Sequence, residues 1–283
     1  MPVFEALHDF RRLVTRSSVQ HGNRRAEVIA IAAQKGGVGK TTTAVHLAAG
    51  LAQFQHKRVL LMDMDAQGHV ETSILQHVGP HNQESLGQIL LGKRRDIYEI
   101  ATATQLDGLW YIPSDRELNH IEAQMASRIG RELLLKRAVR IARTHFDVII
   151  IDCPPNLGSL TINALVAADS ILVPCDLSVL SLDGVQNIYD TVETIRDTLN
   201  PDLRLLGLLR TRVDRRNQKV NGAIEHTLTE AYGPWVLDTD IGICTAISKA
   251  QLAGQTVFTY DPRCRAAAHY EELAAEVVRR FAH

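Results

Sequence analysis

Short apolar runs alternate along the chain with longer stretches in which apolar residues recur every three or four positions. The apolar runs predict strands over residues 27–33, 58–62, 109–113, 147–151, 170–174, 203–213 and 235–237. The amphipathic stretches predict helices over residues 41–54, 115–125, 131–144, 182–199, 218–231, 244–253 and 266–281. This alternation is typical of an α/β fold with a doubly wound, mostly parallel sheet flanked by helices.

The segment before the first predicted strand has an apolar stripe of its own. Its apolar residues fall at helical spacing: Val3, Phe4, Leu7, Phe10, Leu13 and Val14. We expect an N-terminal extension over residues 1–25, with a short amphipathic helix, followed by one domain over residues 26–283. This helix could pack on the flank of the domain, dock a partner protein, or act as a targeting peptide. About 25 residues are too few for a helix-turn-helix domain, so we expect no sequence-specific operator binding.

Composition excludes several classes of protein. The chain of 283 residues is 45% hydrophobic and has 31 Lys and Arg against 32 Asp and Glu, which are the proportions of an ordinary folded protein. No apolar run approaches the roughly 18 residues of a membrane span, and we find no apolar stretch of a secretory signal. The four cysteines form no C-x-x-C motif, so we expect small core residues in a cytoplasmic protein.

A glycine-rich loop joins the first predicted strand to a helix rich in Ala and Leu. It reads Gln34-Lys35-Gly36-Gly37-Val38-Gly39-Lys40-Thr41-Thr42. Glycines let consecutive amides face phosphate oxygens, and the N-terminus of the following helix adds a favourable dipole. The lysine of such a loop neutralises the β- and γ-phosphates, and the hydroxyl after it binds Mg²⁺. We therefore expect residues 35–42 to bind ATP, with Lys40 as a catalytic residue and Thr41 as a metal ligand.

The loop departs from the common pattern G-x-x-x-x-G-K-[ST], because Gln34 takes the place of the first glycine and Lys35 follows it. In this form it resembles the deviant Walker A motif of the ParA/MinD family of P-loop ATPases. The resemblance implies ATP hydrolysis and a homodimer that closes on ATP. It also implies a catalytic role for Lys35, which would reach across the dimer to the phosphates bound by the other subunit.

Acidic residues at two predicted strand ends extend the resemblance. The family motif implies that Asp65, after the second predicted strand, positions the hydrolytic water. Asp63 is either a partner of Mg²⁺ or simply an acid that ends the strand. Asp152 ends the fourth predicted strand as in a Walker B motif, which implies that it binds Mg²⁺ through water. Carboxyl ends of parallel strands face the crevice in which such folds bind ligands.

Later stretches look like ParA sequences of the Soj kind, so the resemblance covers residues 27–280. These stretches are residues 171–174, 211–217, 247–250, 260–262 and 265–267. In the family, the region that corresponds to residues 211–214 lies near the adenine. This correspondence suggests that Thr211, Arg212 and Asp214 bind the nucleotide.

The resemblance implies a switch, in which the ATP dimer binds a large surface and a partner protein stimulates slow hydrolysis. DNA partitioning is the first hypothesis: a nucleoid-associated dimer binds nonspecific DNA, and a ParB-like partner on a plasmid or chromosome releases it. The candidate phosphate contacts are all basic: Arg210, Arg215, Arg216, Lys219, Lys249, Arg263 and Arg265. Asp238 and Asp240 count against this hypothesis, since Soj-like sequences often have a basic residue between the last strand and the next helix.

Other hypotheses stay open beside partitioning. A ParA-like ATPase could position a protein cargo, such as a microcompartment, chemoreceptor cluster or secretion complex, through an adaptor docked on the N-terminal helix. A MinD-type membrane-cycling ATPase needs a basic amphipathic tail. The last predicted helix instead carries three glutamates beside its apolar stripe, so we expect a core helix and no membrane partner. The placement of cysteines and tyrosines argues against nitrogenase-reductase-like proteins and tyrosine-kinase relatives.

Overall fold

A single mostly parallel sheet forms the centre of the computed structural model, which describes residues 25–79, 86–92, 96–214, 216 and 218–281. Its strands are β1 (Glu27–Ile31), β2 (Val59–Asp63), β3 (Thr102–Ala103), β4 (Leu109–Ile112), β5 (Val148–Asp152), β6 (Ser170–Asp176), β7 (Arg204–Val213) and β8 (Val236–Gly242). They lie in the order β3-β4-β2-β5-β1-β6-β7-β8. Within the described residues, the short edge strand β3 alone runs antiparallel to its neighbour.

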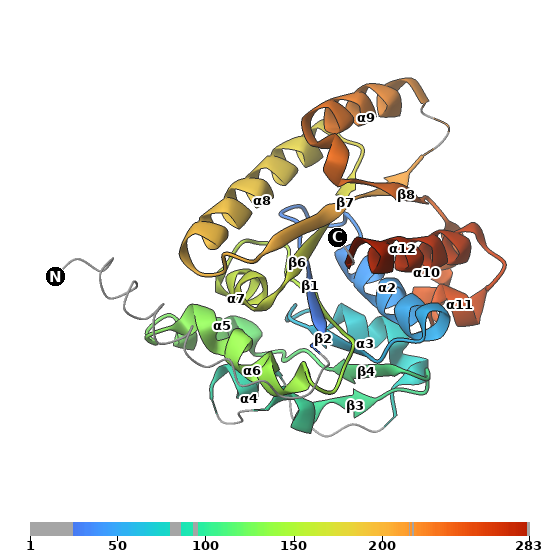
Figure 1. Ribbon diagram of the computed structural model, residues 1–283. Coiled ribbons are helices and arrows are strands. Elements are labelled where there is room, and N and C mark those ends of the chain that lie inside the picture. Colours follow the sequence, from blue (N-terminus) through green and yellow to red (C-terminus); the bar gives the residue numbers. More distant parts are fainter. Residues whose placement is uncertain (1–24, 80–85, 93–95, 215, 217, 282–283) are drawn as a thin grey trace.

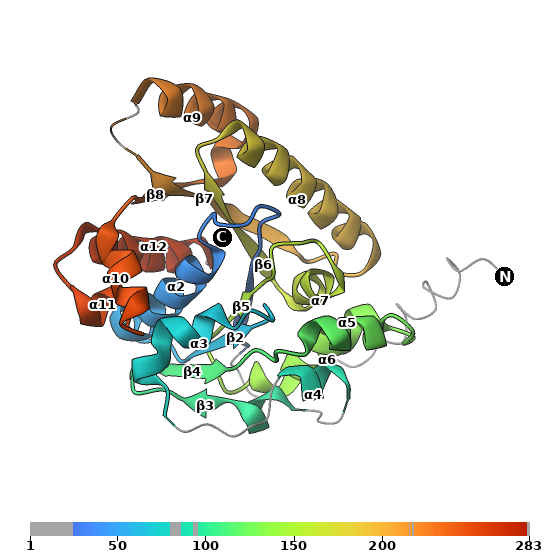
Figure 2. The ribbon, with the colours of Figure 1, turned by 180° about the vertical axis from the view of Figure 1, so that it is seen from behind.

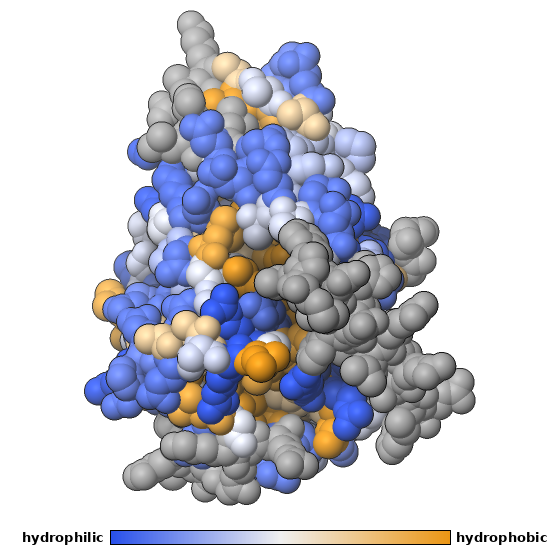
Figure 3. All heavy atoms as spheres, turned by 90° about the vertical axis from the view of Figure 1, so that its left-hand side faces the viewer, coloured by the Kyte–Doolittle hydropathy of each residue, from blue (hydrophilic) through white to orange (hydrophobic). Residues whose placement is uncertain are grey.

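Helices cover both faces of this sheet (Figures 1 and 2). One face carries α2 (Lys40–Gln55), α3 (His69–Ile74), α10 (Thr245–Leu252), α11 (Val257–Tyr260) and α12 (Arg265–Phe281). The other carries α4 (Leu86–Leu90), α5 (Leu118–Met125), α6 (Leu134–Ala142), α7 (Ser159–Ala167), α8 (Val179–Thr198) and α9 (Gln218–Tyr232). Short 3-10 turns follow α3 and α9, at Leu75–His77 and Gly233–Trp235, and others lie at Ile97–Ile100 and Arg131–Leu133. Figure 3 shows that the flank with α7 and α8 is largely hydrophilic, with apolar residues reaching the surface in its middle.

The structure confirms the predicted fold class and all seven predicted strands. It corrects the last strand, which runs to Gly242, so that Asp238 and Asp240 lie within β8 and not in the connection after it. The helix α7 was not predicted, because nearly all of its residues are buried and it has no polar face to give a period. The first 24 residues, and with them the predicted N-terminal helix, lie outside the described residues.

The helix that follows the glycine-rich loop is buried along most of its length. Gly50 of α2 lies against α12, where an added Cβ would stand 3.3 Å from both the Ala274 Cβ and the Tyr270 carbonyl oxygen. Tyr270, Leu273 and Val277 of α12 are fully buried in this contact, which confirms the prediction of a core helix at the C-terminus. Among the described residues, no helix has the length and apolar composition required to cross a membrane.

A buried histidine joins α2 to the segment before α12. His46 Nε2 accepts a hydrogen bond of 3.1 Å from the Val257 amide, so its Nδ1 carries the proton and donates to the Thr42 carbonyl at 2.7 Å. The ring also stacks on Tyr270, with centroids 4.7 Å apart. Burial lowers the pKa of His46 to about 4, although the Thr42 carbonyl favours the protonated ring.

We predict that this histidine makes the fold sensitive to mild acid. Because its folded pKa of about 4 lies below the unfolded value of about 6.5, the unfolded chain binds the extra proton between these values. The free energy of unfolding should therefore fall by about 3 kcal/mol from this group as the pH drops from 7 to 4. Urea unfolding across this range should show a shallower loss in His46→Phe than in wild type. Equal pH dependence of the two proteins would contradict the prediction.

Candidate nucleotide-binding site

The carboxyl ends of the central strands meet at one edge of the sheet, and they bring the predicted site residues together. Asp63 of β2 lies opposite Asp152 of β5 in the strand register, and Asp152 lies opposite Ile31 of β1 on its other side. The glycine-rich loop leaves β1 at this same edge and enters α2. Three separate segments of the chain therefore build one site because the sheet is parallel.

Two glycines of the loop adopt backbone conformations that other residues rarely take. Gly37 and Gly39 have φ values of 76° and 88°, in the left-handed region. Gly39 directly precedes the first turn of α2, so the positive end of the helix dipole faces the loop. Lys40 is only 7% exposed, and its Nζ donates to the Lys35 carbonyl at 3.2 Å. Burial lowers the pKa of Lys40, opposed mainly by the negative charge of Asp152.

Asp152 has the properties of a carboxylate that binds a cation. It is fully buried, and among the described residues neither of its oxygens has a hydrogen-bond partner. Burial raises the pKa of Asp152 to about 7, and the nearby Thr41 hydroxyl and Lys40 ammonium limit this rise. A buried carboxylate needs a compensating charge or hydrogen bond. Carboxylate and hydroxyl oxygens are ligands that Mg²⁺ prefers, so Asp152 and Thr41 fit this metal.

Asp63 and Asp65 differ in what their side chains already bind. Both oxygens of the buried Asp63 accept backbone amides, from Asp65 at 2.9 Å and from Val70 at 3.2 Å. Burial and the charge of Asp152 raise the pKa of Asp63 well above its usual value. Asp63 therefore organises the loop after β2, and the geometry favours a strand-end acid over the expected metal ligand. Asp65 is half-buried in this loop and accepts the Gln67 amide through one carboxylate oxygen.

The Lys35 side chain is bound by residues that were not predicted. Its Nζ donates to both oxygens of Asp176 at 3.0 and 2.9 Å, and to the Ser178 hydroxyl at 3.0 Å. The hydroxyls of Ser178 and Ser181 also donate to Asp176. Burial alone would raise the pKa of Asp176, but these hydrogen bonds hold it below its usual value. Asp176 ends β6 at the same edge as Asp152, so the strand-end argument used for Asp152 could have identified it.

The end of β7 contacts the backbone of the glycine-rich loop. The Thr211 hydroxyl donates to the Val38 carbonyl at 2.7 Å, and the Arg212 guanidinium donates to the Gly37 carbonyl at 3.0 Å. Arg212 has a φ of 53°, a strained conformation for a residue with a side chain. The structure thus places both residues against the loop itself, whereas Asp214 pairs with Arg216. Their contact with adenine stays a prediction.

The predicted DNA contacts fall into four groups. Arg210 is only 14% exposed and pairs with Glu225, while it donates to the Leu237 and Asp238 carbonyls. Its guanidinium is therefore engaged within the fold, and its contact with DNA stays a prediction. Arg216 is 84% exposed in its pair with Asp214. Three further candidates are exposed on the side of the sheet that carries α10 and α12: Lys249, Arg263 and Arg265. The side chains of Arg215 and Lys219 lie outside the described part of the structure.

Comparison with known proteins identifies related sequences. A family model described as an AAA domain matches residues 26–205. The chain is 39% identical over 251 residues to the sporulation initiation inhibitor protein Soj of Bacillus subtilis, covering 89% of this chain and 98% of that protein. It is 36% identical over 256 residues to the chromosome partitioning protein ParA of Caulobacter vibrioides, covering 89% and 94% of the two chains.

A solved structure also matches over most of its length. It is described as cobyrinic acid a,c-diamide synthase from Mycobacterium smegmatis with bound ADP and magnesium. The two chains share 33% identity with a TM-score of 0.77, over 91% of this chain and 96% of that one. A related protein of the same fold therefore binds a nucleotide and magnesium.

We predict that substituting Asp152 changes the Mg²⁺ dependence of ATP hydrolysis, whereas substituting Asp63 mainly changes stability. In Asp63→Asn, an amide group must face one of the two backbone amides, so the free energy of unfolding should fall by about 1–3 kcal/mol. The Mg²⁺ concentration for half-maximal ATP hydrolysis should stay within about twofold of wild type. In Asp152→Asn, this Mg²⁺ concentration should rise by about tenfold or more. Urea unfolding measures the stability of each variant, and a Mg²⁺ titration of ATP hydrolysis measures the half-maximal concentration. A similar rise of this concentration in the two variants would make Asp63 a metal partner.

Proposed function

Because this chain belongs to the ParA/Soj family of P-loop ATPases, we propose that it is a switch that closes into a homodimer on ATP and then binds nonspecific DNA. A ParB-like partner would stimulate hydrolysis and release the dimer during plasmid or chromosome segregation. The protein would act in the cytoplasm, on the nucleoid. The observation that carries this proposal is the pair of lysines in one loop, Lys35 at its front and the buried Lys40 at the helix.

The site residues divide the work of hydrolysis between them. The loop amides and Lys40 would hold the β- and γ-phosphates, and Thr41 and Asp152 would hold Mg²⁺, which neutralises charge on the phosphates. Asp65 lies on the loop after β2 with a half-buried carboxylate suited to orient a water molecule. Since phosphoryl transfer depends mainly on positioning and charge, these residues suffice for slow turnover.

Lys35 links hydrolysis to dimerisation in this proposal. To reach the phosphates of a second subunit, it must leave Asp176 and Ser178, which bind it at 2.9–3.0 Å. Its side chain is one-third exposed, so this ion pair is partly screened by solvent and its rupture costs little. Because this contact must break before the dimer can form, it favours the monomer.

The exposed basic residues near α10 and α12 are the remaining surface for DNA. Lys249 lies in α10 and Arg265 begins α12, two helices on the same side of the sheet, and Arg263 comes two residues before α12. A homodimer would carry two copies of this basic surface. Phosphate contacts of this kind bind DNA without sequence preference. A second candidate function is the positioning of a protein cargo, favoured by the two aspartates of the edge strand β8.

We predict that DNA binding requires ATP and weakens steeply with salt. Asp65→Ala should trap the ATP dimer, and its affinity for random double-stranded DNA should fall about a thousandfold between 50 and 200 mM salt if six or more phosphates are contacted. Fluorescence anisotropy with ATP, ADP and no nucleotide measures this. Arg263→Glu/Arg265→Glu should weaken binding at least tenfold, whereas Arg140→Glu, on the exposed side of α6, should not. Absence of binding by the trapped dimer would exclude both nucleoid-based functions.

We predict that Asp176→Asn strengthens ATP-dependent dimerisation. The variant loses the charge that retains Lys35, and a partly exposed ion pair of this kind is worth up to about 1 kcal/mol, or about fivefold in the dimerisation constant. Sedimentation of the Asp65→Ala background with ATP measures the constant, and Lys35→Gln should abolish the effect. Weaker dimerisation in Asp176→Asn would show that Asp176 supports the dimer instead of the monomer.

A further inference from the structure

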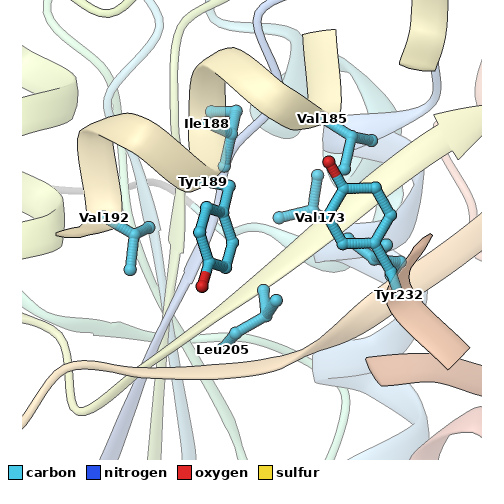
Figure 4. Close-up of a pocket in the computed structure, with 8 residues that line it drawn as sticks. Val173, Val185, Ile188, Tyr189, Val192, Leu205 and Tyr232 are labelled. Atoms are coloured by element: carbon cyan, nitrogen blue, oxygen red, sulfur yellow. The ribbon is translucent and has the colours of Figure 1, made fainter. Parts of the chain in front are cut away.

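Two helices on one face of the sheet contact loops of the nucleotide site. The first, α8, lies closely against the sheet, and the cavity beneath it has a volume of about 10 Å³, enough for about one water molecule (Figure 4). Its lining residues Val185, Ile188 and Val192 are only 1–3% exposed. This cavity therefore offers no ligand site. The second helix, α5, joins two loops of the site through polar contacts.

The first of these contacts lies just beyond the end of β4. This strand pairs with β2 in parallel, and Met62 lies opposite Ile112. Ser114, two residues farther on, lies beside the loop that carries Asp65, and its hydroxyl donates to the Asp65 carbonyl at 2.5 Å. On the other side of the same residue, the Asp65 amide donates to Asp63 at 2.9 Å. The backbone of Asp65 is therefore held on both sides of its Cα, from the ends of two neighbouring strands.

The second contact comes from the middle of α5 and reaches the start of α7. One carboxylate oxygen of Glu122 accepts the Leu160 amide at 3.2 Å. Gly158, the residue before α7, lies against the same oxygen, since an added Cβ there would stand 2.7 Å from it. The positive end of the α7 dipole also favours a carboxylate at this place. Glu122 thus fixes the end of the loop that leads from Asp152 to α7.

The helix between these two contacts is anchored in the core. Its buried side chains pack in the apolar core of this face: Leu118, Ile121 and Met125. Asp115 begins the helix, because its carboxylate accepts the Glu117 amide and its carbonyl accepts the Leu118 amide, both at 2.9 Å. Ser114 and Glu122 are therefore held in a fixed position relative to each other.

We infer that Ser114 and Glu122 are positioning residues for ATP hydrolysis, which set the loop that carries Asp65 against the loop that follows Asp152. The inference rests on the proposed function, in which Asp65 orients the hydrolytic water and Asp152 holds Mg²⁺. Misplacing a catalytic group by about 1 Å can cost about a hundredfold in rate. Because both residues act through backbone groups of these two loops, their loss should lower kcat and leave ATP binding intact.

ATP hydrolysis by the full-length protein tests the role of Ser114. In Ser114→Ala, kcat should fall about tenfold, while the KM for ATP stays within about twofold of wild type. Ser114→Thr keeps the hydroxyl and should stay within about twofold of the wild-type kcat.

Ser73→Ala is the matched control for this variant. It removes a buried hydroxyl that donates to the His69 carbonyl at 2.8 Å in α3, the helix that follows the Asp65 loop, and it should leave kcat within about twofold of wild type. A wild-type kcat in Ser114→Ala, or an equal loss in Ser73→Ala, would overturn the proposal. Failure of Ser114→Thr to maintain turnover would overturn it as well, because the effect would then not depend on the hydroxyl.

Glu122 is tested by the same assay. Glu122→Ala should lower kcat about tenfold with an unchanged KM for ATP. Glu122→Gln keeps an oxygen that can accept the Leu160 amide, so its kcat should stay within about threefold of wild type. Hydrolysis at the wild-type rate by Glu122→Ala would overturn the joint role of the two residues.

Combination with Asp65→Ala separates this inference from the proposed function. In the Asp65→Ala background, Ser114→Ala should lower the remaining rate by less than about twofold, because the side chain that it positions is already gone. Additive losses would overturn the inference, since Ser114 would then act through another group. Slow hydrolysis in Asp65→Ala beside a wild-type rate in Ser114→Ala would overturn this inference alone. A wild-type rate in Asp65→Ala would instead overturn the role of Asp65 in the proposed function.

Discussion

The burial of Asp152 at the end of β5 is the constraint on which the site depends. This strand lies between β1 and β2, so its terminal carboxylate is enclosed by both neighbours and by the glycine-rich loop. A buried carboxylate with no hydrogen bond destabilises the fold unless a cation compensates it. Lys40 and a metal held with Thr41 are the available cations. Binding of Mg²⁺ and nucleotide therefore relieves an electrostatic cost that the fold itself creates.

The phosphate loop is shaped by contacts from the opposite half of the sheet. Thr211 and Arg212 fix two consecutive carbonyls of the loop, and Asp176 holds the Lys35 side chain at its front. Carbonyls held outward leave the loop amides oriented inward, which is the arrangement that binds phosphate. The strained backbone of Arg212 is consistent with such a positioning role. The loop is thus preorganised before any nucleotide binds.

Sequence patterns predicted the strands and the phosphate loop because these features are local. A buried strand reads as an apolar run, and the loop needs glycines at fixed positions. The contacts that were missed are between segments distant in sequence, such as Lys35 with Asp176. The partners of Arg210 were missed as well, because no local pattern shows that Glu225 and two carbonyls of β8 bind its guanidinium. Spacing places a residue at a strand end, but tertiary packing decides what its side chain binds.

The helix α8 adjoins the phosphate loop at its N-terminal end and the start of the described chain at its C-terminal end. Its N-terminal end follows Ser178, which binds Lys35, and Asn187 in its third turn donates to Gln34 at 2.7 Å. Its C-terminal half borders the place where the described chain begins. A small displacement of this helix would therefore shift the hydrogen-bond partners of Gln34 and Lys35, the two residues that precede the loop glycines. A displacement of α8 would bias the release of Lys35, because this helix adjoins the residues that retain this lysine.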